Sequence, residues 1–402
     1  MARRMPEDPM VRKLIGMMSG AQLDRRSLLR GALLTGAGVG AATLSACAGG
    51  GGGAGDGSAG KIVWGNWTYY LDYDADTGSW TSLDSFMEET NITVDYIEDI
   101  DDNNTFFGKI KDQLELGQFT GYDTITLTDW MNARLLEAEQ IQEFDHANIP
   151  NLSNLLPSLV DSLDVDPGRK FTIPWQAPAS GFVWNTEAVP DGIKTLDDFL
   201  RPELKGKVGV LSEMRDTMGI IMSAQGVDIA GDWGDAEFDA ALAWLDDGIK
   251  SGQITQVKGN SYTQDLETDT TLAAIAWTGD IAALNFEQGD RWTLEVPESG
   301  GVIAADSFTV PNGTSAENKA LVEEMINYYY QPEVAAQVAD YVQFVTPVAG
   351  AQEAMESVNP DQVDNPLIFP DDEMNSRLHG FRTLTPQEDN QYTAAFQSVL
   401  GL

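Results

Sequence analysis

Cysteine and histidine are nearly absent from this 402-residue chain, which has one cysteine, Cys47, and two histidines, His146 and His379. A single thiol excludes an internal disulfide and a cysteine-rich zinc site. The histidines are far apart and have no metal-ligating neighbours in the sequence, so we interpret them as surface or capping residues. We therefore expect neither a metal nor a cofactor. Without disulfides the chain must rely on a large hydrophobic core, which its length allows in two lobes.

Basic residues are also scarce, and the net charge is −39. Residues 1–46 hold seven Arg/Lys and three Asp/Glu, so the remainder carries a charge of −43. Such a field repels phosphate backbones and argues against nucleic-acid binding. It raises the concentration of cations near a cleft, although many of the acids are explained by solubility alone.

No apolar run reaches the roughly 20 residues that a membrane-spanning helix needs. The run at 31–44 follows Arg25-Arg26 and ends at Leu44-Ser45-Ala46-Cys47. This order is typical of a twin-arginine export signal (residues 1–47) with a lipobox, in which Cys47 is lipidated. Residues 48–60 are glycine-rich and are predicted to form a flexible tether. We expect an exported protein, anchored at the outer face of the cell membrane or periplasmic; the alternative is an amphipathic helix with a chance cysteine.

Sequence signatures of common enzymes are missing too. The chain has no G-x-S-x-G elbow, no phosphate-binding G-x-x-x-x-G-K-[ST] loop and no H-E-x-x-H pair. We therefore expect a binding protein rather than an enzyme. A glycosidase needs only two carboxylates, so an exported carboxylate-dependent hydrolase stays open as an alternative.

What the sequence does contain is a regular alternation of short β-rich runs with amphipathic helical patterns. Residues 236–250 have apolar side chains at helical spacing, Ser315 is a predicted N-cap for a helix to Tyr330, and Pro332 opens the next helix. This alternation predicts an α/β fold with largely parallel sheets. The predicted strands are 62–64, 92–97, 123–127, 181–184, 207–211, 273–277 and 307–310.

Aromatic residues stand next to acids and small polar residues just after several of these strands. Because strand ends meet at one edge of an α/β sheet, these clusters are expected to share a cleft. For any single tryptophan, core packing is the competing explanation. The clusters are 64–70, 128–130, 213–216, 277–280 and 304–307.

These clusters resemble, in order along the chain from about Lys61 to Gln352, the spermidine/putrescine-binding proteins of polyamine ABC importers. The matching motifs are Asn66-Trp67-Thr68-x-Tyr70, Thr128-Asp129-Trp130-Met131, Glu213-Met214-Arg215-Asp216, Trp277-Thr278-Gly279-Asp280 and Gly300-Gly301-x-x-x-x-Asp306-Ser307. The resemblance implies a type II periplasmic-binding-protein fold with a ligand cleft between two α/β lobes. It implies lobes of residues 61–178 plus 305–352 and of 179–304 plus 353–402.

The resemblance also implies the ligand site. In the family, some of the matching positions hold aromatic or small hydroxyl side chains that line the ligand pocket. Others hold carboxylates that bind an amine of the ligand. One departure is Ala304, where the family commonly has a large aromatic residue, so one wall is thinner. The residues carried over are Trp67, Thr68, Tyr70, Thr128, Trp130, Glu213, Asp216, Trp277, Asp280, Asp306 and Phe344.

Carboxylates and aromatic rings together suit a small organic cation. Each ammonium head binds a carboxylate, and an aromatic face favours the cation and covers the methylene stem. The expected ligand is a polyamine of the putrescine or spermidine class, and the expected partners are the permease subunits of an ABC importer, with the chain a monomer. A binding protein for a neutral sugar or another small solute also uses aromatic platforms and remains an alternative.

Overall fold

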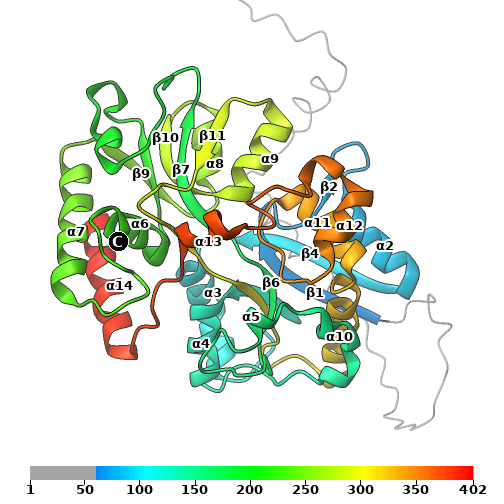
Figure 1. Cartoon of the computed structure of the whole chain (residues 1–402). Coiled ribbons are helices and arrows are strands. Elements are labelled where there is room, and N and C mark those ends of the chain that lie inside the picture. Colours follow the sequence, from blue (N-terminus) through cyan, green and yellow to red (C-terminus); the bar gives the residue numbers. More distant parts are fainter. Residues whose placement is uncertain (1–59, 402) are drawn as a thin grey trace, which may run out of the picture. The chain divides into compact units, whose positions relative to one another are not determined.

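The computed structural model describes residues 60–401 (Figure 1). The predicted export signal, Cys47 and nearly all of the glycine-rich tether lie outside the described residues. The described part is an α/β protein built on two mixed β-sheets, each with its own covering helices. We call these two units the first lobe and the second lobe.

The first lobe contains a five-stranded sheet in the order β4-β1-β5-β13-β6. Strand β1 pairs in parallel with β4 and β5, whereas β13 is antiparallel to β5 and β6. A short antiparallel hairpin of β2 and β3 follows β1. The bounds are β1 (Gly60–Trp67), β2 (Tyr73–Asp74), β3 (Ser79–Trp80), β4 (Ile92–Ile100), β5 (Thr124–Thr128), β6 (Ile173–Gln176) and β13 (Asp306–Thr309).

The second lobe contains the strands β14-β12-β7-β10-β8-β9 in that order, with β11 pairing to β7. Strands β10, β8 and β9 run parallel, and β7 is antiparallel to β10, β11 and β12. The bounds are β7 (Ala179–Asn185), β8 (Val208–Leu211), β9 (Ile254–Lys258), β10 (Ala273–Trp277), β11 (Trp292–Glu295), β12 (Gly301–Ile303) and β14 (Leu378–His379).

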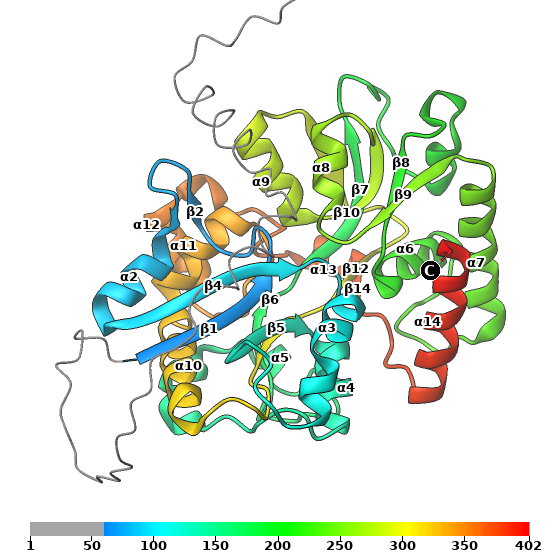
Figure 2. The ribbon, with the colours of Figure 1, turned by 180° about the vertical axis from the view of Figure 1, so that it is seen from behind.

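Helices follow most of the strands. Helix α10 packs on β1, and α6 and α14 pack on α7 (Figures 1 and 2). The bounds are α2 (Thr81–Thr90), α3 (Asn103–Glu115), α4 (Asp129–Glu137), α5 (Pro157–Val160), α6 (Met214–Ala224), α7 (Asp235–Lys250), α8 (Tyr262–Glu267), α9 (Thr278–Gln288), α10 (Ala316–Tyr329), α11 (Pro332–Val342), α12 (Ala351–Val358), α13 (Asp372–Arg377) and α14 (Pro386–Leu400).

The predicted elements are present within a few residues of their expected bounds. All seven predicted strands form, and the helix expected at 236–250 is α7. Ser315 caps α10 by accepting a hydrogen bond from the Asn318 amide at 3.1 Å, and Pro332 is the first residue of α11. The sheets are less purely parallel than predicted, because β13 and β7 run against their neighbours.

The chain passes between the two sheets at two short links. Strand β6 of the first sheet ends at Gln176, and β7 of the second sheet begins at Ala179. Strand β12 of the second sheet ends at Ile303, and β13 of the first sheet begins at Asp306. Both links therefore hold the ends of strands from two sheets close together. The exact lobe boundaries stay a prediction.

Aromatic packing stabilises the centre of the first lobe. The buried ring of Phe308 on β13 lies 5.1 Å, between centroids, from both Trp64 on β1 and Trp175 on β6. The Trp64 indole also donates to the Thr126 hydroxyl at 2.8 Å, so its polar atom is satisfied within the core.

Within residues 60–401, no helix combines the length and hydropathy that crossing a membrane requires.

Removing the Phe308 ring should strongly destabilise the fold. Phe308 is fully buried, and Phe→Ala changes in cores cost about 3–5 kcal/mol because they leave a cavity. The matched control is Phe286→Ala on α9, where the side chain is 80% exposed, and its effect should stay within about 0.5 kcal/mol. Urea denaturation of both variants measures the difference, and equal stabilities would contradict this account of the core.

Candidate functional site

A cavity lies where strand ends and helix starts of the two lobes meet. Its empty volume, counted out to the open solvent at its mouth, is about 340 Å³. Both lobes and both interlobe links contribute to its wall, as expected for carboxyl ends of strands in an α/β fold. The lining residues are Trp67, Tyr70, Thr128, Pro178, Glu213, Asp216, Asn260, Trp277, Ala304 and Asp306.

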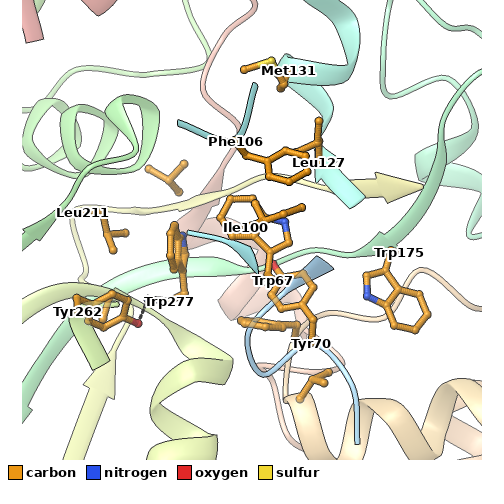
Figure 3. Close-up of a cluster of buried hydrophobic side chains, with 14 of the residues drawn as sticks. Trp67, Tyr70, Ile100, Phe106, Leu127, Met131, Trp175, Leu211, Tyr262 and Trp277 are labelled. Carbon is orange, nitrogen blue, oxygen red and sulfur yellow. Dashed lines mark hydrogen bonds between the residues drawn. The ribbon is translucent and has the colours of Figure 1, made fainter. Parts of the chain in front are cut away.

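The first lobe supplies an aromatic wall. Trp67 is the last residue of β1, and its indole N–H donates to the Thr126 carbonyl at 3.0 Å, which fixes the ring. Tyr70 follows after Tyr69, which has the left-handed φ of 63°, and the Tyr70 ring lies 5.1 Å from that of buried Phe344. Figure 3 shows Trp67 and Tyr70 side by side, with Trp277 across from them.

The second lobe supplies Trp277 at the end of β10. Its indole centroid is 6.0 Å from that of Trp67, and the two planes are 71° apart. The Trp277 Nε1–H donates to Asp216 Oδ1 at 3.0 Å, and the Ser180 hydroxyl donates to the same oxygen. Asp216 lies in the first turn of α6, where the positive end of the helix dipole favours a carboxylate. The rings on opposite lobes thus face a shared space.

Among the carboxylates that line the cavity, Asp306 has an oxygen with incomplete hydrogen bonding. Its Oδ2 accepts a hydrogen bond from the Tyr70 hydroxyl. The Thr128 hydroxyl lies near enough to the carboxyl to lower its pKa, but the buried Oδ1 has no hydrogen bond of good geometry within residues 60–401. Burial raises the pKa of Asp306 from its ordinary value to about 7. A buried acceptor without a good hydrogen bond calls for a donor from outside the protein.

Asp280 forms a second buried acid directly behind the cavity. It lies in the first turn of α9, and its Oδ2 accepts from the Asn260 side-chain amide at 2.8 Å. Burial raises the pKa of Asp280 to about 7. Its Oδ1 is also buried and has no hydrogen bond of good geometry within residues 60–401, although the Tyr262 hydroxyl lies near enough to the carboxyl to lower its pKa. Asn260 lines the cavity and therefore lies between the Asp280 carboxylate and the cavity.

Glu213 and Asp216 complete the acidic lining. Burial raises the pKa of both carboxyls, and the negative charges of Asp102 and Asp216 raise that of Glu213 further. Glu213 Oε1 accepts from the backbone amide of Asn103 at 2.7 Å and from its side-chain amide at 2.8 Å. Negative charge in this cavity is consequently costly as long as no cation accompanies it.

Direct contacts hold the two lobes together beside the cavity. The Asp101 carbonyl accepts from the Asn260 amide at 3.0 Å, and the Asp101 carboxylate accepts from the Ser261 amide at 2.7 Å. The Ser212 hydroxyl donates to Asp102 Oδ2 at 2.6 Å. The Asp101–Asn103 turn of the first lobe thus meets strand ends of the second lobe, and the structure is a closed form.

The predicted site residues occupy different layers. Asp280 and Phe344 lie one layer behind the cavity wall, where they contact Asn260 and Tyr70. Thr68 is half-buried and is not among the lining residues, and Trp130 instead lines an adjacent hollow. Seven predicted residues line the cavity itself: Trp67, Tyr70, Thr128, Glu213, Asp216, Trp277 and Asp306.

Three lining residues, Asn260, Pro178 and Ala304, were not among the predicted ligands. Asn260 follows β9, a half-exposed edge strand whose polar residues hid the strand pattern. Asn260 could have been predicted as a small polar residue just after a strand, which is the pattern that indicated the other clusters. Pro178 lies in the link that the family resemblance already implied as a crossing.

Comparison with known proteins gives consistent matches. The family model described as "Bacterial extracellular solute-binding protein" matches residues 81–369. The putrescine-binding periplasmic protein PotF of Escherichia coli is 24% identical over 83% of this chain and 90% of its own length. The spermidine/putrescine-binding periplasmic protein of the same organism is 26% identical over 77% and 82%, respectively. These matches confirm the resemblance predicted from the strand-end motifs.

A solved structure agrees with the fold. The spermidine/putrescine ABC transporter substrate-binding protein PotD of Streptococcus pneumoniae superimposes with a TM-score of 0.65 at 22% identity, covering 85% of this chain and 98% of that one. The type II periplasmic-binding-protein fold predicted from the sequence is therefore confirmed. At this identity the superposition supports the fold alone. The ligand class is inferred from the chemistry of the cavity.

The close approach of the two lobes depends on Gly259. Substituting this residue tests whether its contact with the other lobe limits closure. A Cβ at Gly259 would lie 1.6 Å from the Asp101 carbonyl oxygen of the other lobe. Gly259→Ala should disfavour closure by the overpacking cost of about 1–3 kcal/mol, because the lobes can relieve it by separating. Small-angle X-ray scattering should show a larger radius of gyration, with an unchanged unfolding midpoint.

The control for this test is Gly108→Ala. Gly108 lies within α3, and a Cβ there would meet no atom within 4 Å. This variant should keep the dimensions of the parent protein. If Gly259→Ala scatters like Gly108→Ala, the Gly259–Asp101 contact does not limit closure.

Proposed function

Because this chain belongs to the bacterial extracellular solute-binding protein family, we propose that it captures a small organic cation of the polyamine class and delivers it to an ABC importer. The two lobes close on the ligand, and the permease subunits in the membrane recognise the closed form. The protein acts outside the cytoplasm, tethered through a lipidated Cys47. It binds its ligand as a monomer and transforms no substrate.

One observation carries the choice of a cation. Asp306 is buried among aromatic rings, its Oδ1 has no hydrogen bond of good geometry within residues 60–401 although the Thr128 hydroxyl lies near, and burial raises its pKa. A protonated amine in the cavity supplies both the missing hydrogen bond and the compensating charge. Charge-assisted hydrogen bonds of this kind are about twice as strong as neutral ones.

The surrounding groups suit the rest of such a ligand. The faces of Trp67 and Trp277 favour an ammonium group by about 0.5–2 kcal/mol each, depending on desolvation. Glu213 and Asp216 line the cavity at a different position from Asp306, so a second ammonium has its own partner. Methylene groups between the two heads would lie along the indole and phenol rings.

Ligand binding and closure are coupled through the same charges. Closing the lobes over ionised Asp306 and Asp280 without a cation leaves uncompensated buried charge, which costs several kcal/mol per ion. With a cation present that cost disappears, and the interlobe hydrogen bonds of Asp101 and Asn103 favour the closed form. The ligand thus shifts the population toward the form that the permease recognises.

The names of the relatives point to the same ligand class. The curated relatives are named for binding putrescine, spermidine, cadaverine or agmatine, all of which are amines that are cationic at neutral pH. They match most of this chain, and the seven lining residues come from the motifs that carry the resemblance. Sequence similarity and cavity chemistry therefore support the same proposal.

The decisive variant is Asp306→Asn. Asparagine keeps the size and the hydrogen bond with Tyr70 but removes the charge, so amine affinity should fall by about ten- to 150-fold, the value of one charged hydrogen bond. Isothermal titration with putrescine and spermidine measures the affinity. The melting temperature should stay equal or rise, because a costly buried charge is removed.

Asp112→Asn, at an exposed position on α3, serves as the matched control and should bind amines like the parent protein. A neutral sugar and a basic amino acid complete the ligand panel. Tight sugar binding that Asp306→Asn leaves unchanged would replace the proposal with a neutral-solute function. Conversion of a ligand during the titration would identify an enzyme instead.

A further inference from the structure

A second and larger hollow adjoins the cavity of the proposed site. Its empty volume, counted to its open mouth, is about 1660 Å³. Three residues, Thr128, Asp216 and Ala304, line both hollows, so the two adjoin at these positions. The wall of the second hollow comes from α4, the segment 159–165, β12 with its link to β13, and the segment 380–390.

Half-buried and exposed apolar side chains form much of this wall. Val165 is 37% exposed, and the other members of the set are half-buried. Apolar surface left accessible in a concave region marks a binding site for an apolar group. The set consists of Leu159, Leu163, Val165, Ile303, Phe381 and Leu384.

The charged groups of the second hollow are already paired. Asp389 bridges Arg134 at 2.6 Å and Arg215 at 2.8 Å, and Arg382 pairs with Glu388 at 2.7 Å. Asp129, on the same wall, is paired with buried Arg169 at 2.8 Å. An additional ammonium group would therefore meet neutralised acids here.

The carboxylates of Glu137 and Asp164 also line the hollow, but both residues are exposed. Solvent and salt screen exposed carboxylates, so they attract a cation only weakly. Apart from Asp216 at its junction with the first cavity, the second hollow therefore has no buried unpaired acid, and its outer walls favour an uncharged group.

Trp130 explains why this wall is preformed. The Arg215 guanidinium lies 4.0 Å from the Trp130 ring centroid and that of Arg134 lies 5.1 Å away, so the ring is covered by the protein's own cations. Since Asp389 on α14 holds both arginines, α4, α6 and α14 are tied into one unit. Trp130 thus shapes the second hollow rather than the amine cavity.

Ala304 lies at the junction of the two hollows. Its side chain is a single methyl group at the junction, and a large side chain there would divide the space. The opposite wall, 380–390, lies beyond residue 369, where the match to the family model ends.

We propose, on the basis of the cation-binding function above, that the ligand is an N-substituted diamine whose free ammonium binds at Asp306. Its uncharged, largely apolar substituent passes Ala304 into the second hollow. An N-acyl diamine with a chain of several carbons has this chemistry, because acylation removes one positive charge and adds apolar length. The amide at the junction lies near the hydroxyl of Thr128.

The test compares 1,4-diaminobutane with N-hexanoyl-1,4-diaminobutane by isothermal titration of the purified protein. Acylation removes one charged contact, worth about ten- to 150-fold, but adds roughly fourfold for each methylene group that becomes buried. With the four acyl methylene groups buried, the acylated amine should therefore bind more tightly. Ala304→Phe should reverse the order, so that the ratio of the two affinities falls below one.

Leu163→Asn provides an independent variant on the half-buried outer wall. It should weaken the acylated amine and leave 1,4-diaminobutane unchanged, because Leu163 lines only the second hollow. The melting temperature of each variant reports whether it folds.

The outcomes separate the two proposals. If 1,4-diaminobutane binds and acylation gives no gain, or if Ala304→Phe and Leu163→Asn leave the gain intact, the second hollow is not a ligand subsite and the amine-binding function stands. If neither amine binds the parent protein, the proposed function itself fails, and the inference fails with it.

Discussion

The buried carboxylate of Asp306 is the constraint on which the site depends. It lies at the link between the two sheets, it is surrounded by aromatic rings, and one of its oxygens has no hydrogen bond of good geometry within the described residues. A protein holds such a group only at a cost in stability, since burial disfavours the ionised form. The cost is consistent with a group kept for binding. The closed form becomes favourable when a positive charge enters, which makes the ligand part of the packing.

The fold creates this situation through its topology. Strands β1, β5, β10 and β13 begin or end at the cavity, and α4, α6 and α9 start beside it. Acids in the first turns of α6 and α9 face the positive ends of those helices, which offsets part of the repulsion among them. Gly259 allows the lobes to touch closely enough for the acids to be buried. Removing any one of these features would leave a wetter and less selective cavity.

Much of this arrangement could be predicted from the sequence, because it depends on local patterns. Trp67, Trp277 and Asp306 each stand at a strand end, and the rule that such ends converge brought them to one site. The layering could not be predicted: Asp280 lies behind Asn260, and Trp130 is covered by Arg215 through contacts with the distant Asp389. Those details follow from side-chain packing between separate elements, which are 20 residues apart for Asn260 and Asp280 and 174 apart for Arg215 and Asp389. The role of Ala304 was visible only as a missing aromatic residue, and the hollow beside it required coordinates.

Proton release during binding tests the central claim most directly. Burial raises the pKa of Asp306 and Asp280 to about 7, so both are largely protonated below that pH and lower the stability of the ligand-free protein as the pH rises from about 4 through 7. An ammonium ligand requires their ionised forms. Titrations at pH 6.5 in buffers of different ionisation enthalpy should therefore show release of about one proton per amine, and the affinity should rise with pH up to roughly 8. Binding without proton release and without pH dependence would contradict the account.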